Sequence, residues 1–153
     1  MRAVPIRTGA LAAALLVCLA GCGGGGGSPS APSTPAPPEF LRRLIVEGSQ
    51  SNLPPASTGA AYIQVIEAIG IGTVTLEATV DWTFPSNPVA VAWGQGDCIQ
   101  DPNCPFLVQN TTGAKPKTIT ASNVPEGSYS LVILNLGTTN ESVSFQIFGI
   151  TLR

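Results

Sequence analysis

The stretch Thr73-Val-Thr-Leu-Glu-Ala-Thr-Val-Asp-Trp82 decides the fold. Its apolar residues fall at every second position, and threonines and acids take the positions between them. Side chains of a β-strand point alternately to opposite sides, and an antiparallel sheet commonly buries one side and exposes the other to water. The stretch therefore predicts a half-buried antiparallel strand, with one face made of Val74, Leu76, Ala78, Val80 and Trp82.

Seven further strand-like runs surround this one, separated by turn clusters such as Pro85-Ser-Asn-Pro88. Short runs bounded by Gly, Pro, Asn and Ser are typical of strands. The fold class that follows is all-β, a single antiparallel β-sandwich of the jelly-roll or immunoglobulin-like kind with about eight strands. Residues 62–69 fit a helical stripe nearly as well as a strand. The further strands are expected at residues 44–47, 62–68, 89–94, 106–109, 117–121, 128–136 and 143–152.

Residues 74–152 carry several motifs in a fixed order. A strand ends in Asp81-Trp82, an alternating strand follows, and Asn123-Val-Pro-Glu-Gly-Ser-Tyr129 leads into the next strand. This order resembles the bacterial pre-peptidase C-terminal domains, small jelly-roll-like sandwiches appended to secreted proteins. The resemblance implies a fold more than a function. In the turn, Gly127 supplies a tight backbone conformation and we expect Tyr129 to pack its ring inward.

The first 22 residues have the organisation of an export signal that ends in a cysteine. Arg2 and Arg7 form a basic segment, and residues 9–19 form an apolar run too short to span a bilayer, which takes roughly 20 residues. The segment Leu19-Ala20-Gly21-Cys22 resembles the lipobox of bacterial lipoproteins. The resemblance implies that the chain is cut before Cys22 and that Cys22 is acylated, so that acyl chains hold the protein in a membrane. The alternative is an ordinary secretory signal with an incidental cysteine.

The expected organisation is a signal peptide at residues 1–21, a lipidated cysteine and tether at 22–38, and a β-sandwich domain at 39–153. The tether is a glycine run followed by a Pro, Ser, Ala and Thr mixture, which need not fold and which spans on the order of 20–45 Å. The domain is large enough for one core. Gly23 is not the aspartate that resembles an inner-membrane retention signal, so we expect the outer membrane, with the domain facing either the periplasm or the medium.

Charge and residue content exclude several functions. From Cys22 onward the chain carries five Lys and Arg against nine Asp and Glu, a net charge of −4. Nucleic-acid binding needs a basic stripe, so we expect no nucleic-acid partner. The chain has no histidine and no Gly-x-Ser-x-Gly motif, which removes His-based triads and most catalytic zinc sites. We expect neither enzymatic activity nor a cofactor.

The cysteines that remain in the mature domain are Cys98 and Cys104. Cys18 leaves with the signal and Cys22 carries the lipid, so in an oxidising compartment this pair should form a disulfide. The loop it closes is short, and the chain-entropy model gives only about 2 kcal/mol for closing it. The bond is therefore expected to stiffen one hairpin tip.

Ligand-binding candidates are few, and each has a structural alternative. Asp97, Asp101 and Asn103 offer oxygen ligands for a cation such as Ca²⁺, but they lack the spacing of a calcium loop, and aspartates around a proline also favour turns. Trp82 and Trp93 could form an aromatic platform for sugars, although both share a strand face with core residues. Phe106 is the better candidate for an exposed aromatic contact, although the alternative, that it belongs to a small cluster under the loop, is the favoured interpretation.

The function expected from these features is that of a lipid-anchored envelope protein. Its sandwich domain would act as a non-catalytic interaction module that contacts an envelope protein or an extracellular polymer through loops at one end. The alternative is a carbohydrate- or calcium-binding module, possibly accessory to a separate hydrolase.

Overall fold

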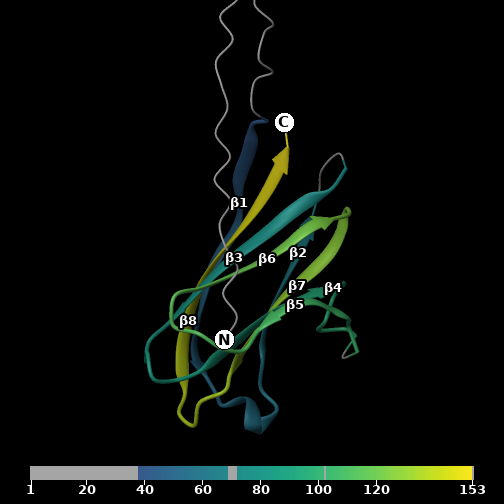
Figure 1. Cartoon of the computed structure of the whole chain (residues 1–153). Coiled ribbons are helices and arrows are strands. Elements are labelled where there is room, and N and C mark those ends of the chain that lie inside the picture. Colours follow the sequence, from purple (N-terminus) through teal and green to yellow (C-terminus); the bar gives the residue numbers. More distant parts are fainter. Residues whose placement is uncertain (1–37, 69–71, 102, 153) are drawn as a thin grey trace, which may run out of the picture. The chain divides into compact units, whose positions relative to one another are not determined.

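A computed structural model describes residues 38–68, 72–101 and 103–152, which form eight antiparallel strands (Figure 1). The predicted all-β sandwich is confirmed. A 3-10 turn, η1 (Ala56–Thr58), joins the first two strands, and no helix in the described part of the chain is long and apolar enough to cross a membrane. The strands are β1 (Phe40–Leu53), β2 (Tyr62–Ala68), β3 (Val74–Trp82), β4 (Val89–Gln95), β5 (Phe106–Asn110), β6 (Lys117–Val124), β7 (Gly127–Asn135) and β8 (Glu141–Leu152).

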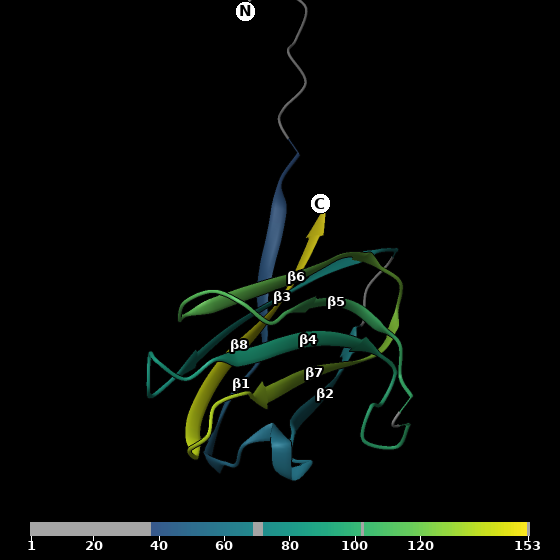
Figure 2. The same ribbon diagram turned by 60° about the horizontal axis from the view of Figure 1, so that its bottom comes forward.

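The strands form two four-stranded sheets. Sheet A has the order β1-β8-β3-β6, and sheet B has the order β2-β7-β4-β5 (Figure 2). Except for the β4–β5 hairpin, each connection carries the chain from one sheet to the other. Eight strands wound in this way make the double Greek key of a jelly roll. The strand order thus favours the jelly-roll form of the expected sandwich over the immunoglobulin-like form.

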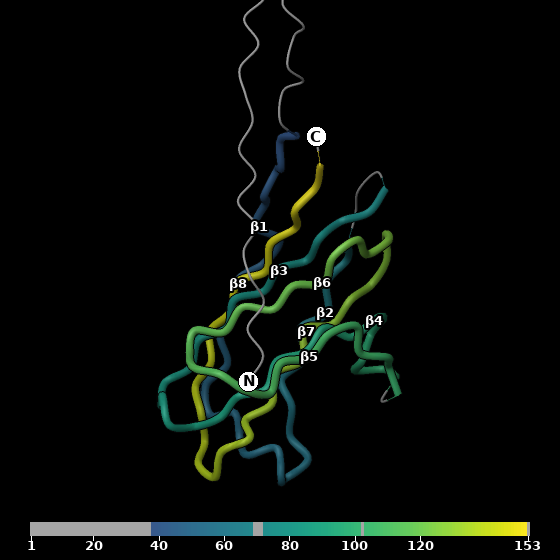
Figure 3. Tube along the Cα trace, viewed as in Figure 1, coloured from purple at the N-terminus to yellow at the C-terminus, as the bar shows by residue number. Residues whose placement is uncertain are grey.

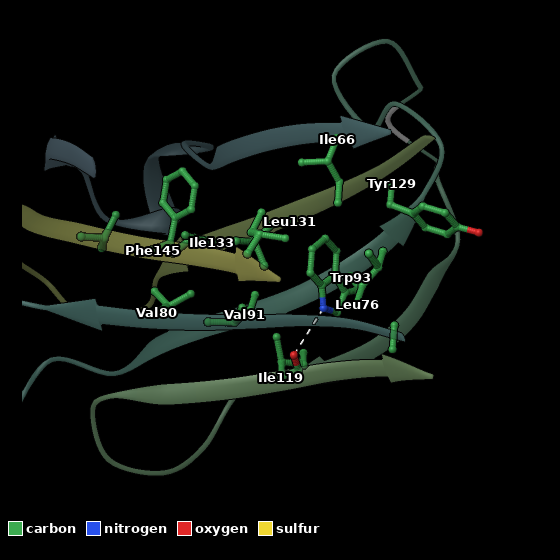
Figure 4. Packing of buried hydrophobic residues seen from close by; sticks show 14 of the residues in the cluster. Ile66, Leu76, Val80, Val91, Trp93, Ile119, Tyr129, Leu131, Ile133 and Phe145 are labelled. Carbon is green, nitrogen blue, oxygen red and sulfur yellow. Dashed lines mark hydrogen bonds between the residues drawn. The ribbon is translucent and has the colours of Figure 1, made fainter. Parts of the chain in front are cut away.

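The core lies between the two sheets and follows the alternation of the sequence. β3 buries every second residue, as its pattern predicts, and β7 contributes Tyr129, Leu131 and Ile133 from the facing sheet (Figure 4). Trp93 of β4 is fully buried among them, and its indole N–H donates to the carbonyl of Ile119 across the core at 3.4 Å. The core is therefore continuous from one sheet to the other.

The tyrosine of the β6–β7 turn packs as expected. The ring of Tyr129 is buried, and its hydroxyl donates to the carbonyl of Pro125 at 2.8 Å. Burial raises the pKa of this phenol. Gly127 adopts a φ of 149°, a conformation that side chains rarely allow. The turn and the ring together fix where β7 enters sheet B.

The predicted strand at residues 44–47 is present, but it lies within the much longer β1, so its predicted bounds were too narrow. β1 pairs with almost the whole of β8, from Phe40 opposite Leu152 to Leu53 opposite Glu141. Two register shifts, at Leu44/Val46 and at Gln50/Leu53, break the two-residue period. A bulge adds a residue to one strand and changes the face that later side chains take, so β1 as a whole has no continuous two-residue alternation.

Glu141 and Asn135 are buried polar residues at the opposite end of the strands from the β6–β7 turn. The Glu141 carboxylate accepts the backbone N–H groups of Thr83 and Phe84 at 2.9 and 3.1 Å, and the Asn87 amide at 2.9 Å. Asn135 donates to the carbonyls of Leu53 and Thr139. Buried polar groups are stable only when hydrogen-bonded, and these bonds hold the loops of this end in place.

The register of β3 predicts opposite results for neighbouring substitutions. Leu76→Asp places an unpaired charge in the core and should lower the free energy of unfolding by several kcal/mol. Thr75→Ser, on the outer face, should change it by roughly 0.5 kcal/mol or less. Trp82→Ala should cost about 3–5 kcal/mol as a core truncation. Denaturant titration measures all three, and a tolerated Leu76→Asp beside a destabilising Thr75→Ser would contradict the register.

Candidate functional site

The disulfide loop between β4 and β5 lies against the outer face of sheet B. Cys98 and Cys104 are bonded, as predicted, with their Cα atoms 5.3 Å apart. Both sulfur-bearing residues are buried in a small apolar cluster with Val132, against which Ile63, Ala92 and Leu134 also pack. The bond therefore does more than stiffen a hairpin tip, because it also covers part of the outer face of sheet B.

Two residues of sheet B make room for the loop and hold it. A Cβ atom on Gly94 would lie 2.3 Å from the sulfur of Cys98, so only glycine fits under the disulfide. The buried hydroxyl of Ser130 accepts the backbone N–H of Cys98 at 3.0 Å and donates to the carbonyl of Gly96 at 2.8 Å. The sequence analysis missed both residues. Their signal was a glycine and a serine at outward positions of two apolar strands.

The acidic residues of the loop hydrogen-bond to the loop's own backbone. The Asp97 carboxylate accepts the N–H of Ile99, and the Asp101 carboxylate accepts the N–H of Asn103, each at 2.9 Å. Bonds of this kind, from a side chain to the backbone two residues on, define Asx turns. Among the described residues, no three His, Cys, Asp or Glu side chains gather as metal ligands do. The geometry favours the turn interpretation of Asp97, Asp101 and Asn103 over the calcium site.

The tip of the loop presents apolar side chains to solvent. Ile99 is 59% exposed and Phe106 is 53% exposed. The alternative that Phe106 is covered by a cluster under the loop is therefore wrong. We call Ile99, Pro105, Phe106 and the disulfide the loop tip. Because the disulfide, the Asx turns and Ser130 fix its backbone, the loop tip offers a preorganised apolar surface.

The two tryptophans cannot form a platform for sugars in this fold. Trp82 and Trp93 are both buried in the core between the sheets, and neither ring offers a face to solvent. Their candidacy as ligand-binding residues is thus corrected, and the core alternative holds. Strand parity predicts this outcome, since each tryptophan continues the inward face of its strand.

The outer faces of the two sheets differ in chemistry. On sheet A the hydroxyls of Thr79 and Thr118 lie 3.2 Å apart, and Gln146 donates to Glu47 at 3.3 Å. The central outward positions of sheet B are uncharged and mostly apolar. The apolar outward residues of sheet B are buried or half-buried, several of them under the disulfide loop, and they include Ile63, Val65, Ala90, Ala92, Val132 and Leu134.

Lys117 is a buried cation whose hydrogen-bond partners are backbone carbonyls. Its ammonium donates to the backbone carbonyls of Val89 and Asn110 and lies 5.7 Å from the centre of the Trp82 ring. Burial lowers the pKa of this ammonium. No acidic side chain is recorded beside it, and the carbonyls that it contacts belong to strand ends. Lys117 therefore ties β4, β5 and β6 together at the edge of the sandwich.

The solved structures that are similar to this chain include two with low TM-scores. No family model matches the chain, and no curated protein matches it. A mitogen derived from Yersinia pseudotuberculosis is similar over 72% of this chain and 85% of its own, with 12% identity and a TM-score of 0.46. A Bacillus endospore appendage protein, from a family of disulfide-linked pili, is similar over 82% and 100%, with 13% identity and a TM-score of 0.32. At these TM-scores neither likeness carries an argument.

The disulfide lies directly over Gly94, so the effects on stability of substituting Gly94 and of removing the two sulfurs should be coupled. Gly94→Ala should destabilise the oxidised protein, because the new methyl group must displace a sulfur atom. In a Cys98→Ala, Cys104→Ala background the same substitution should cost much less. A double-mutant cycle by denaturant titration measures the difference. Equal costs in the two backgrounds would show that the loop does not lie on Gly94.

Proposed function

We propose that this chain is a lipid-anchored protein of the bacterial envelope and that its sandwich domain is a non-catalytic interaction module. The observation that carries the proposal is the loop tip, where Ile99 and Phe106 are exposed on a loop held by a disulfide. Exposing large apolar side chains to water is unfavourable, and a fixed backbone lowers the entropy lost on binding. A loop of this kind is suited to docking against a partner.

The chemistry of the surface suggests the kind of partner. The loop tip offers the exposed apolar side chains of Ile99 and Phe106, and the outer face of sheet B beneath the loop has few charges. Such a surface complements an uncharged, apolar surface of another envelope protein, or the apolar faces of an extracellular polymer. The non-catalytic part of the proposal rests on the missing histidines and on loop carboxylates that are engaged by the backbone.

The anchor part of the proposal rests on sequence. Cys22 and the lipobox-like residues before it lie outside the described residues, as does most of the tether. A cysteine in this setting receives acyl chains, and two or more chains give stable attachment. Gly23 favours the outer membrane. The module is then tethered at a membrane and free to meet partners within reach of the tether.

The loop tip can be tested by cross-linking in intact cells. A photoreactive phenylalanine analogue at position 106 should give discrete protein or polymer adducts. The same analogue at Phe84, which is 51% exposed at the opposite strand ends, should not. Replacing both cysteines with alanine should weaken the adducts from position 106, because the backbone is then released. Equal adducts from both positions, or none from position 106, would argue against a binding loop.

The anchor predicts that Cys22→Ser abolishes membrane association and leaves the domain folded. The tether separates the two, so the substitution does not reach the core. Labelling with radioactive palmitate, with far-UV circular dichroism as the folding control, measures both effects. Palmitate incorporation that persists in Cys22→Ser, or a wild-type protein that washes off as a soluble species, would contradict the lipoprotein assignment.

A further inference from the structure

The ends of β1 and β8 form a ribbon with unusual exposure. We call residues 40–45 and 148–152 the ribbon end. Phe40 is 67% exposed and lies opposite Leu152, which is 66% exposed. Figure 3 shows the two strands running side by side to the point where the described chain begins and ends. These large apolar residues at the tips of both strands are not part of the core of the sandwich.

The ribbon end is apolar on both of its faces. Phe40 and Leu44 share the outer face of sheet A with Leu152. On the other face, Leu41 and Ile45 border an open groove of about 520 Å³ together with Val74. A strand at the surface of a sandwich normally keeps one polar face, and contiguous exposed apolar patches mark interaction sites. Arg43 also lines this groove, as do Glu67 and Ala68 at the end of β2 in sheet B.

Charge is divided sharply between the ribbon end and the rest of the domain. Residues 40–45 and 148–152 hold two arginines and no acid. The remainder of the chain after Cys22 holds two lysines, one arginine and nine acids. Arg42 also pairs with Glu77 at 2.7 Å and lies over the ring of Phe148, whereas Arg43 is exposed. The ribbon end therefore carries net positive charge on an otherwise acidic domain.

The edge of β1 is poorly suited to receiving another strand. Its two register shifts interrupt the regular row of backbone groups, and Arg42, Arg43 and Glu47 place charges along it. Bulges and charges are the devices by which edge strands avoid pairing with other chains. A second copy added at this edge is therefore disfavoured, while the apolar tips remain uncovered.

The ribbon end is also where the anchored segment joins the domain. Seventeen residues separate Cys22 from Phe40, and a linker of this length and composition lets the domain touch the bilayer to which its own end is attached. Apolar side chains flanked by arginines are typical of segments that lie in the interface of anionic membranes.

We propose that the ribbon end lies in the surface of the membrane that holds the lipidated Cys22. Phe40, Leu44 and Leu152 enter the boundary between headgroups and acyl chains, and Arg43 lies among anionic headgroups. The acidic remainder of the domain is repelled from the same surface. This contact rests on the proposed anchor and gives the domain a defined orientation. β1 and the β4–β5 loop belong to opposite edges of the two sheets.

The contact can be tested with tryptophan depth measurements on the full lipidated chain in vesicles. The vesicles contain brominated phosphatidylcholine and phosphatidylglycerol. The variants are Phe40→Trp and, as the matched control, Phe84→Trp. The native tryptophans are buried and provide the wild-type background. We expect the added emission of Phe40→Trp to be quenched at least about twofold more than that of Phe84→Trp, because only position 40 enters the lipid. Adding Arg43→Glu should reduce this quenching.

The outcomes separate the ribbon contact from the anchor. Flotation of the vesicles reports the anchor, and a wild-type chain that does not float with them overturns both proposals. A chain that floats but whose Phe40→Trp variant is quenched no more than Phe84→Trp overturns the ribbon contact alone. If Phe40→Trp is instead shielded only as protein concentration rises, and sedimentation shows a dimer, a second copy covers the ribbon end and the lipid contact is wrong.

Discussion

The burial of alternating faces between two sheets is the constraint on which the rest of the structure depends. β3 and β8 supply Leu76, Val80 and Ile147 from one sheet, and β7 supplies Leu131 and Ile133 from the other. Each strand commits every second residue to this core, so the positions between are left for the two outer faces. Sheet A has polar residues at the central positions of its outer face, such as Thr79 and Thr118, whereas sheet B has mostly apolar ones. The residues at these outward positions therefore determine the chemistry of the surface.

Strand patterns predicted most of the fold because the core is apolar and the strands alternate between buried and outward residues. β3 is half-buried, and its alternation is complete in the sequence. β2 was ambiguous between helix and strand, and the structure gives a reason: Tyr62 and Ile66 face the core while Ile63 and Val65 lie on the apolar outer face of sheet B. With apolar residues on both sides, the period of two disappears. The predicted length of β1 was too short because its bulges shift the faces of the residues around them.

The candidate site was predictable only in part. Cysteine counting predicted the disulfide, but a covalent pair does not say on which surface its loop lies. That depends on Gly94 and Ser130, which are 36 residues apart and become neighbours only when β4 pairs with β7. Likewise, the buried carboxylate of Glu141 and the buried ammonium of Lys117 find partners on strand ends that no local pattern connects. Such contacts form only when distant strands pair, and local sequence patterns do not predict which distant residues become neighbours.

The identity of the mature N-terminus tests most directly the proposed order of export signal, lipid, tether and interaction domain along the chain. Intact-mass spectrometry of the protein extracted from envelopes with detergent should give a chain that begins at Cys22 and carries acyl groups. Its mass should be two hydrogens lower than that of the fully reduced chain, because Cys98 and Cys104 are bonded. A chain without acyl groups, or one that begins at another residue, would contradict the account.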